Sequence, residues 1–339
     1  MTGVPPGPAT GGAAWPADRA AVWPGDHVRR QAGGMTRVVT VAAAQVGPVL
    51  PDQSRADVVE RLVALLRGAA LRGADLVIFP ELALTRFFPR WWFEDGDPAL
   101  DAFYDADARS PETKPLWEEA ARLGVGVVLG FAERARDGRR FNTSVMVDGS
   151  GAEVGRYRKV HLPGHREHEP WRRFQHLEKR YFQRGDLGFP TYRAFGGTVG
   201  MLICNDRRWP ESYRLLGLQG VELVCIGYNT PIHNPPAPEH DRYGDFHNHL
   251  VMQAGAYQNG TFVVASAKAG TEDGVDHIGG SCVIHPSGTV IAQCTGLGDE
   301  LAVAACDLDD CTSYKTTVFD FARHRQPDLY GPIAEGPTP

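Results

Sequence analysis

Three short segments of the chain each place a reactive side chain directly after an apolar run that is typical of a β-strand. They are FPELALT with Glu81, YRKVHLPGH with Lys159 and LICNDRRWPE with Cys204. Functional side chains gather at strand ends in α/β sheets, so we expect these three to converge. A thiol nucleophile needs a base, and Glu81 can take its proton. Attack on a carbonyl carbon develops negative charge on oxygen, which Lys159 and the N–H group of Asn205 can stabilise.

The surroundings of Cys204 also favour reactivity. The residue lies between an apolar strand and a helix, and this turn is expected to expose the sulfur and to direct backbone N–H groups toward it. The neighbouring Arg207 and Arg208 favour a thiolate. Taken alone, each reactive residue also fits a structural role. Glu81 fits a surface carboxylate, Lys159 a solvated charge and Cys204 a buried strand thiol.

The apolar pattern predicts the elements that must position these residues. Apolar runs predict buried strands over 38–44, 75–79, 125–133, 199–204, 221–227, 261–265 and 301–307. Helical spacing of apolar residues predicts helices over 57–72, 112–123, 210–218 and 241–258. Two hairpins are expected, 142–148 with 153–157 and 281–285 with 289–293. The pattern indicates one mixed α/β domain, in which helices on the outer faces of two stacked sheets would bury both sides of the strands.

The composition excludes several classes of protein. The chain has 339 residues, 42% of them hydrophobic and 22% charged, which is ordinary for a globular protein. The formal net charge of −6 argues against a dedicated nucleic-acid binder, which usually carries a basic excess. No apolar run is long enough for a transmembrane helix, so no membrane partner is expected. The six cysteines form no CxxC motif and no signal peptide is seen, so free thiols in a cytoplasmic protein are expected.

The first 34 residues differ from the rest of the chain. Gly, Pro and Ala occupy 19 of these 34 positions. Such a segment buries too little apolar surface to offset its ordering entropy, so residues 1–34 are predicted to be a disordered extension. The extension is either an upstream start-codon addition or a mobile tail of the protein. The globular domain is expected to span residues 35–335.

The three segments carry a family resemblance. PELALT, YRKVHLPG and ICNDRRWPE resemble the catalytic motifs of the carbon–nitrogen hydrolase (nitrilase) superfamily. The chain is further similar to the N-carbamoyl-D-amino acid hydrolases over nearly all of 36–335. The segments that carry this similarity are FPRWWF, RRFNTS, GHREHE, FQHLEKRYF, GDLGFP, GYNTPIHNPP, MQAGAYQNG and HRQPDLYG. The resemblance implies a four-layer α-β-β-α sandwich, no cofactor, and a homodimer or homotetramer.

The resemblance also implies roles for the catalytic residues. Glu81 would be the general base, Lys159 the oxyanion stabiliser and Cys204 the nucleophile. Glu178, in HLEK, matches a second glutamate that would fix Lys159 and orient the substrate amide. The structural alternative is a helix-surface Glu178 paired with a neighbouring base.

Substrate contacts are implied in the same way. A guanidinium binds a carboxylate with two parallel hydrogen bonds, which suits Arg207 and Arg208 to the α-carboxylate of an N-carbamoyl amino acid. Alternatively, both arginines pair with nearby acids. The further substrate-binding residues implied by the resemblance are Asn205, Asn229, Thr230, His161 and His176.

The spacing of the twelve histidines does not favour metal binding. His161, His165, His168 and His176 cluster, but prolines and a glycine interrupt this segment, so it does not present its histidines on one helix face. No HExxH or Cys-His zinc pattern occurs. The sequence therefore predicts no metal site, and structural histidines are the preferred interpretation.

The function expected from these residues is hydrolysis of N-carbamoyl-D-amino acids to the D-amino acid, ammonia and carbon dioxide through a covalent cysteine intermediate. The enzyme alternative is another amidase of the superfamily, acting on carbamoyl-β-alanine, carbamoylputrescine or a simple amide. The alternative from another class is a catalytically silent binding or scaffold protein. Side-chain preference remains open at this point.

Overall fold

A computed structural model describes residues 37–233 and 239–335. These residues belong to one compact unit, Thr36–Pro339. The expected N-terminal extension, residues 1–34, lies outside the described residues. Residues 234–236, in the second half of the GYNTPIHNPP segment, also lie outside them.

The first sheet has the strand order β15-β1-β2-β4-β5-β6, and β3 pairs with β4. Strands β1, β2 and β4 are parallel, while β15, β5 and β6 add antiparallel neighbours. The strands are β1 (Val38–Gln45), β2 (Leu76–Ile78), β3 (Tyr104–Asp105), β4 (Gly126–Arg134), β5 (Arg140–Val147), β6 (Glu153–Arg158) and β15 (Glu300–Asp307).

The second sheet repeats this plan with the order β14-β13-β10-β9-β8-β7. Its centre, β10, β9 and β8, is parallel, and its outer strands are antiparallel. The strands are β7 (Thr191–Ala194), β8 (Gly197–Ile203), β9 (Leu223–Tyr228), β10 (Phe262–Ala267), β13 (Cys282–Ile284) and β14 (Val290–Gln293). A separate hairpin joins β11 (Ala269–Glu272) to β12 (Val275–Ile278).

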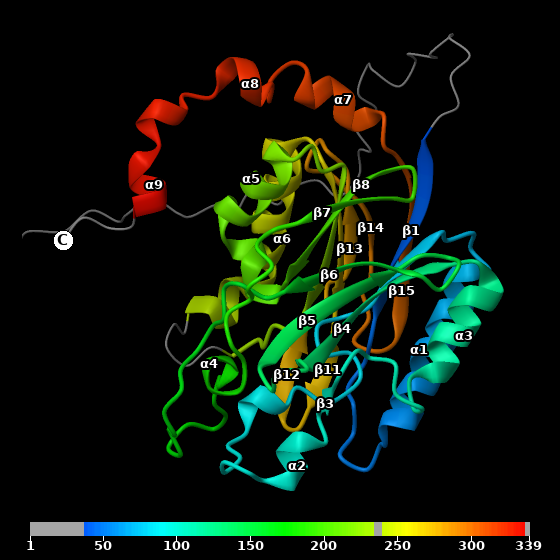
Figure 1. The fold of residues 1–339 in the computed structure, drawn as a ribbon, viewed down its shortest axis with the longest axis vertical. Helices are drawn as coiled ribbons and strands as arrows, with labels where there is room; N and C mark the ends of the chain where they lie inside the picture. The colour runs from blue at the N-terminus through cyan, green and yellow to red at the C-terminus, as the bar shows by residue number, and fades with distance from the viewer. Residues whose placement is uncertain (1–36, 234–238, 336–339) are drawn as a thin grey trace, which may run out of the picture. The chain divides into compact units, whose positions relative to one another are not determined.

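Helices cover the outer face of each sheet, as Figure 1 shows. Helices α1 (Arg55–Ala70) and α3 (Lys114–Leu123) pack on the first sheet, and α5 (Pro210–Leu218) and α6 (Glu239–Asn259) lie over the second. Strand β1 shows why both faces are apolar. Its Val41 joins the core between the sheets, while Ala42 and Ala44 pack against the helix layer. The fold is therefore the expected four-layer α-β-β-α sandwich.

The remaining elements are short. They are α2 (Pro98–Asp101), α4 (Glu178–Tyr181), α7 (Asp310–Lys315), α8 (Phe321–His324) and α9 (Gly331–Glu335), with the 3₁₀ helices η1 (Phe88–Arg90), η2 (Cys204–Arg208) and η3 (Pro327–Leu329). In the described part of the chain, no helix is long and apolar enough to cross a membrane. All six cysteines are buried free thiols.

All four predicted helices and both predicted hairpins are present, with bounds that differ by two residues at most. Four features were not predicted from the sequence: β3, β7, the short helices and the β11–β12 hairpin. This last hairpin turns at Asp273-Gly274, where both residues have positive φ, 51° and 75°. An Asp-Gly pair is a recognised hairpin signal, so this element could have been predicted.

Candidate active site

The chemistry-bearing residues lie just beyond strand ends on the two sheets. Glu81 follows β2, Lys159 directly follows β6, and Cys204 and Asn229 directly follow β8 and β9. The carboxyl ends of parallel strands share one edge of a sheet, so the stacked sheets bring these residues together. The expected convergence of Glu81, Lys159 and Cys204 is therefore seen in the structure.

Glu81 and Lys159 form a fully buried ion pair. Lys159 Nζ lies 2.6 Å from Glu81 Oε1 and 2.6 Å from Glu178 Oε2, and none of the three side chains is exposed to solvent. Asn142 Nδ2 donates to Glu81 Oε1 at 2.8 Å, and the Asn229 N–H donates to Glu81 Oε2 at 3.1 Å. Glu178 thus lies beside the lysine, and the helix-surface alternative for it is wrong.

The charges of this cluster follow from its burial and pairing. Burial alone would lower the pKa of Lys159, but the adjacent Glu178 and Glu81 outweigh it and raise that pKa, so the ammonium stays charged. Burial raises the pKa of Glu81 above its usual value, and the lysine only partly offsets this. Burial would also raise the pKa of Glu178, but Lys159 outweighs burial there and the pKa is lowered.

Cys204 begins η2 in a strained backbone conformation. Its φ is +46°, in the left-handed region that non-glycine residues rarely adopt. Such strain is typical of functional positions that the surrounding structure holds in place. The thiol Sγ lies 3.5 Å from the carbonyl oxygen of Asn229, which accepts its hydrogen bond.

Two expectations for this thiol need correction. The turn does not expose the residue, which is only 6% accessible to solvent. Burial, followed by the negative charge of Glu81, raises the pKa of the Cys204 thiol, so the neighbouring cations do not produce a thiolate at rest. The proton must instead be removed by a base, and the nearby Glu81 carboxylate is suited to this.

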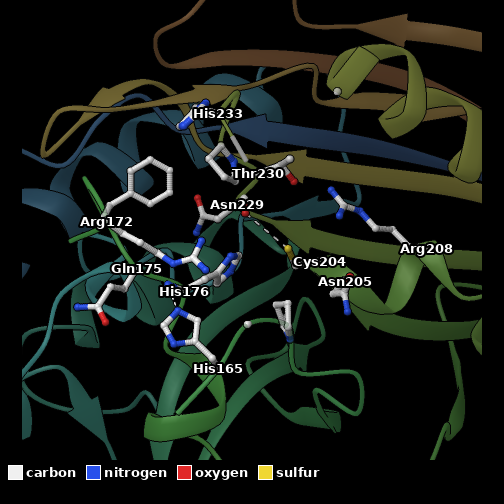
Figure 2. Close-up of a pocket in the computed structure, with 15 residues that line it drawn as sticks. His165, Arg172, Gln175, His176, Cys204, Asn205, Arg208, Asn229, Thr230 and His233 are labelled. Atoms are coloured by element: carbon white, nitrogen blue, oxygen red, sulfur yellow. Dashed lines mark hydrogen bonds between the residues drawn. The ribbon is translucent and has the colours of Figure 1, made fainter. Parts of the chain in front are cut away.

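A pocket of about 210 Å³ opens beside Cys204 (Figure 2). Its walls come from the loop between β6 and α4, from η2, from the segment after β9, and from Gly244 of α6. Five of the residues predicted from the sequence line this one pocket: Cys204, Asn205, Asn229, Thr230 and His176. No aspartate or glutamate lines the pocket within the described residues, while two arginines do.

The predicted arginine pair is split by the structure. Arg207 does not line the pocket: it is 1% exposed, and its guanidinium stacks 4.3 Å from the ring of Tyr228. Its nitrogens donate to the carbonyl oxygen of Cys204 at 2.7 Å, to Thr230 Oγ1 at 2.8 Å and to Asn248 Oδ1 at 2.7 and 3.0 Å. The donors of Arg207 are thus engaged inside the protein and are not presented to the pocket.

Arg208 has the opposite environment. It lines the pocket and makes no hydrogen bond or ion pair within the described residues. The residue is exposed to solvent at the pocket, and desolvation of its guanidinium by the groups around it, followed by the charge of Arg207, lowers the pKa of Arg208 to about 10. A cation that faces a pocket without a partner is suited to an anionic ligand.

The two predicted histidines also differ. His176 lines the pocket, where its Nε2 lies 3.5 Å from Glu178 Oε1, and burial lowers its pKa so that it stays neutral near pH 7. His161 does not line the pocket. Its Nδ1 lies 2.8 Å from Asp206 Oδ1 and its ring stacks on that of Trp209, so its contacts within the protein are made outside the pocket lining.

Sequence reasoning missed the residues that hold this site together. Asn142 bridges the two carboxylates, and Asp206 accepts hydrogen bonds from Tyr157 Oη and the His161 N–H. Gly227 also belongs here, because its missing side chain leaves room for the backbone of Glu81. Asn142 lies in the RRFNTS segment that carries the resemblance, which is the one sequence signal that marks it. Across 37–233 and 239–335, no group of three or more His, Cys, Asp or Glu residues is arranged to hold a metal ion.

A buried thiol beside a carboxylate and a charged ammonium, at the wall of a pocket, can attack a carbonyl carbon and stabilise the resulting oxyanion. This is the chemistry of a thiol-dependent hydrolase. Residues 40–316 match the carbon-nitrogen hydrolase family, and the chain belongs to that family.

Relatives support the same reaction type. An N-carbamoylputrescine amidase of Oryza sativa subsp. japonica is 30% identical over 88% of this chain and 95% of its own length. A citrullinase of Francisella tularensis is 28% identical over 83% of this chain and 94% of its own length. A carbon-nitrogen hydrolase of Helicobacter pylori G27 shares the fold, with a TM-score of 0.75 and 22% identity over 89% of this chain and 99% of that chain. The protein is thus a hydrolase of carbon–nitrogen bonds.

Proposed function

We propose that this protein hydrolyses the carbamoyl group of N-carbamoyl-D-amino acids to the D-amino acid, ammonia and carbon dioxide. The observation that carries the proposal is the unpaired Arg208 guanidinium in the pocket that Cys204 lines. The D configuration rests on the resemblance of segments such as FPRWWF and FQHLEKRYF to the D-specific subfamily. The activity is assigned to residues 35–335, which include the whole family match.

The first half-reaction forms a covalent intermediate. Glu81 removes the proton from Cys204 Sγ, and the thiolate attacks the ureido carbon. The carbonyl oxygen takes up the negative charge, which the Lys159 ammonium and the N–H group of Asn205 stabilise. Collapse of the tetrahedral species breaks the bond to the terminal nitrogen, which leaves as ammonia with the proton held by Glu81. A thiocarbamate ester on Cys204 remains.

The second half-reaction releases the amino acid. Glu81 removes a proton from water, and the hydroxide attacks the thiocarbamate carbon. The carbon–sulfur bond breaks, and the thiolate recovers the proton from Glu81. The product is an N-carboxy amino acid, which loses carbon dioxide to give the free amine. Glu178 keeps Lys159 in place through its 2.6 Å contact and orients the substrate amide.

The charge of the pocket supports an anionic substrate. The α-carboxylate of an N-carbamoyl amino acid lies close to its ureido group, so it can reach Arg208 while the ureido carbon faces Cys204. Asn205 and Thr230 line the same region and add hydrogen-bonding groups. A guanidinium without an internal partner has its donors available for this carboxylate.

The second candidate is another amidase of the family, with carbamoylputrescine as its substrate. The name of the Oryza sativa relative favours it. Carbamoylputrescine carries a free ammonium group, which needs a carboxylate partner when it leaves water. Two arginines and no acidic residue line the pocket within the described residues, so its charge opposes this candidate.

The deciding experiment is ammonia release from a matched substrate panel. The panel contains the D and L forms of one N-carbamoyl amino acid, the analogue without its carboxylate, and carbamoylputrescine. We expect the D form to have the highest kcat/KM. A preference for carbamoylputrescine would contradict the proposal, and no hydrolysis of any carbamoyl compound would favour the catalytically silent alternative.

We also propose that the protein is a homodimer or homotetramer. Several large apolar side chains are exposed on α5 and α6, among them Leu215, Leu218, Leu250 and Tyr257. Burial of such a surface between copies is favourable. Light scattering at micromolar concentration is expected to give at least twice the monomer mass of 37.0 kDa, and a monomer would refute this proposal.

A further inference from the structure

The pocket contains a second arginine that the catalytic chemistry does not use. Arg172 comes from the loop between β6 and α4, whereas Arg208 comes from η2. Figure 2 shows the two side chains on opposite sides of Cys204 and Asn229, with the Arg172 side chain directed toward His176. The pocket thus has a cationic group at each end.

The loop that carries Arg172 is closed at its base. The His165 N–H donates to the carbonyl oxygen of His176 at 2.9 Å. Gly164 has φ +78°, and a Cβ atom there would lie 1.8 Å from the same oxygen, so only glycine permits this closure. Within the loop, the Glu169 N–H donates to Gln175 Oε1 at 2.6 Å and the Arg172 N–H donates to the Glu169 carbonyl at 3.1 Å. These bonds fix the backbone of Arg172 before any ligand arrives.

The Arg172 guanidinium is only partly engaged. Its Nε donates to Glu169 Oε2, which holds the side chain in place. Its terminal nitrogens, Nη1 and Nη2, make no hydrogen bond within the described residues. The side chain is 25% exposed. The two free nitrogens form one edge of the planar group, and such an edge binds a carboxylate with two parallel hydrogen bonds.

We infer that Arg172 is a specificity-determining residue that selects N-carbamoyl amino acids whose side chain ends in a carboxylate. The inference rests on the proposed function. The α-carboxylate pairs with Arg208, the ureido carbon faces Cys204, and the side-chain carboxylate reaches the free edge of Arg172. A dianionic substrate matches a pocket lined by two guanidinium groups and, within the described residues, by no acid.

The structural alternative is that Arg172 serves only to tie the loop to Glu169. The two roles differ in substrate dependence. A loop tie affects all substrates alike, whereas a carboxylate ligand affects only those with an acidic side chain. N-carbamoylglutamate, N-carbamoylglutamine and N-carbamoylnorvaline provide the comparison. The glutamine side chain matches that of glutamate in size without its charge, and the norvaline side chain keeps the same three carbons without the terminal polar atoms.

The test is the ratio of kcat/KM for N-carbamoylglutamate to that for N-carbamoylnorvaline. In the unmodified enzyme we expect the ratio to exceed about ten, with N-carbamoylglutamine between the two. Arg172→Gln should lower the ratio about tenfold or more. The matched control is Arg166→Gln, since Arg166 is exposed on the same loop and does not line the pocket. The kcat/KM ratio of this variant should stay within about twofold of the ratio of the unmodified enzyme.

A second variant separates charge from loop stability. Glu169→Gln removes the negative charge beside the guanidinium but keeps an oxygen that can accept from Arg172 Nε, so KM for N-carbamoylglutamate should fall. If the unmodified enzyme hydrolyses N-carbamoylnorvaline with a kcat/KM equal to or higher than that for N-carbamoylglutamate, the inference is overturned. The proposed function would still stand. An equal loss for all substrates in Arg172→Gln would likewise assign Arg172 to the loop. No hydrolysis of any N-carbamoyl amino acid would overturn both.

Discussion

The backbone of Gly227 lies so close to that of Glu81 that a Cβ atom at position 227 would be 2.7 Å from the Glu81 nitrogen. Gly227 is in β9, and Glu81 follows β2 of the other sheet. Gly130, in β4, makes the same approach from a second side, with 2.8 Å to the Glu81 Cα atom. Two strands, β4 and β9, therefore each have a glycine at the point where they contact the Glu81 backbone. The absence of a side chain at these two points allows the close packing that positions the Glu81 carboxylate.

Gly227→Ala should disturb the site more than the fold. The added methyl group must displace the Glu81 backbone, since that contact is to main-chain atoms. We expect kcat to fall about 100-fold, because small misplacements of reacting groups have effects of this size, with a loss of stability of about 1–3 kcal/mol. The measurement is steady-state kinetics together with thermal unfolding. The control is Gly298→Ala, where nothing lies within 4 Å of the new Cβ, and it should change neither kcat nor thermal stability. Unchanged kinetics in Gly227→Ala would count against this account of Glu81.

Cys204→Ala should abolish turnover while the protein remains folded. The side chain is small, so its loss removes little packing, but no other group can form the thiocarbamate ester. Acid quenching of the unmodified enzyme during turnover, followed by mass spectrometry, should show the adduct on the peptide that contains Cys204. Cys225→Ala, at a buried position in β9, should keep the adduct on Cys204. Residual turnover in Cys204→Ala would remove this residue from the mechanism.

The split arginine pair predicts two different kinetic signatures. Arg208→Ala should raise KM about tenfold or more for carboxylated substrates, and much less for an analogue without the carboxylate. Arg207→Ala should lower kcat for both substrates, because its guanidinium holds the carbonyl oxygen of Cys204. It should also lower stability by about 1–3 kcal/mol, since Asn248 and Thr230 lose their donor. Identical signatures for the two variants would contradict the assignment.

Most of the fold could be predicted from the sequence because its signals are local. Apolar runs and helical spacing set the strands and helices, and Pro210 marked the start of α5 at the correct residue. Short elements such as β7 escaped, since half-buried segments of four residues carry little periodicity. The Asp273-Gly274 turn, by contrast, is a local signal from which the β11–β12 hairpin was predictable.

The candidate site was predictable in its residues but not in its contacts. The convergence of Glu81, Lys159 and Cys204 was predicted from strand-end placement and the family resemblance. The different environments of Arg207 and Arg208 were not predicted. These two adjacent residues lie on one turn of 3₁₀ helix but point to different neighbours, and those neighbours come from elements distant in the sequence. Asn248, which engages Arg207, is 41 residues away in α6. Such long-range partners are decided by packing, which the local pattern does not encode.

The raised pKa of Glu81 predicts the acid limit of the enzyme. The residue acts as a base only when ionised, and burial raises its pKa above the usual value of about 4.3. Activity should therefore fall as the pH drops through a value above 4.3, seen as the acid limb of a kcat/KM profile. The charge of Glu178 contributes to this rise, so the residual activity of Glu178→Gln should have its acid limb at lower pH. Glu118→Gln, at an exposed position on α3, should leave the limb in place. An unshifted limb in Glu178→Gln would show that another group, and not Glu81, titrates in this range.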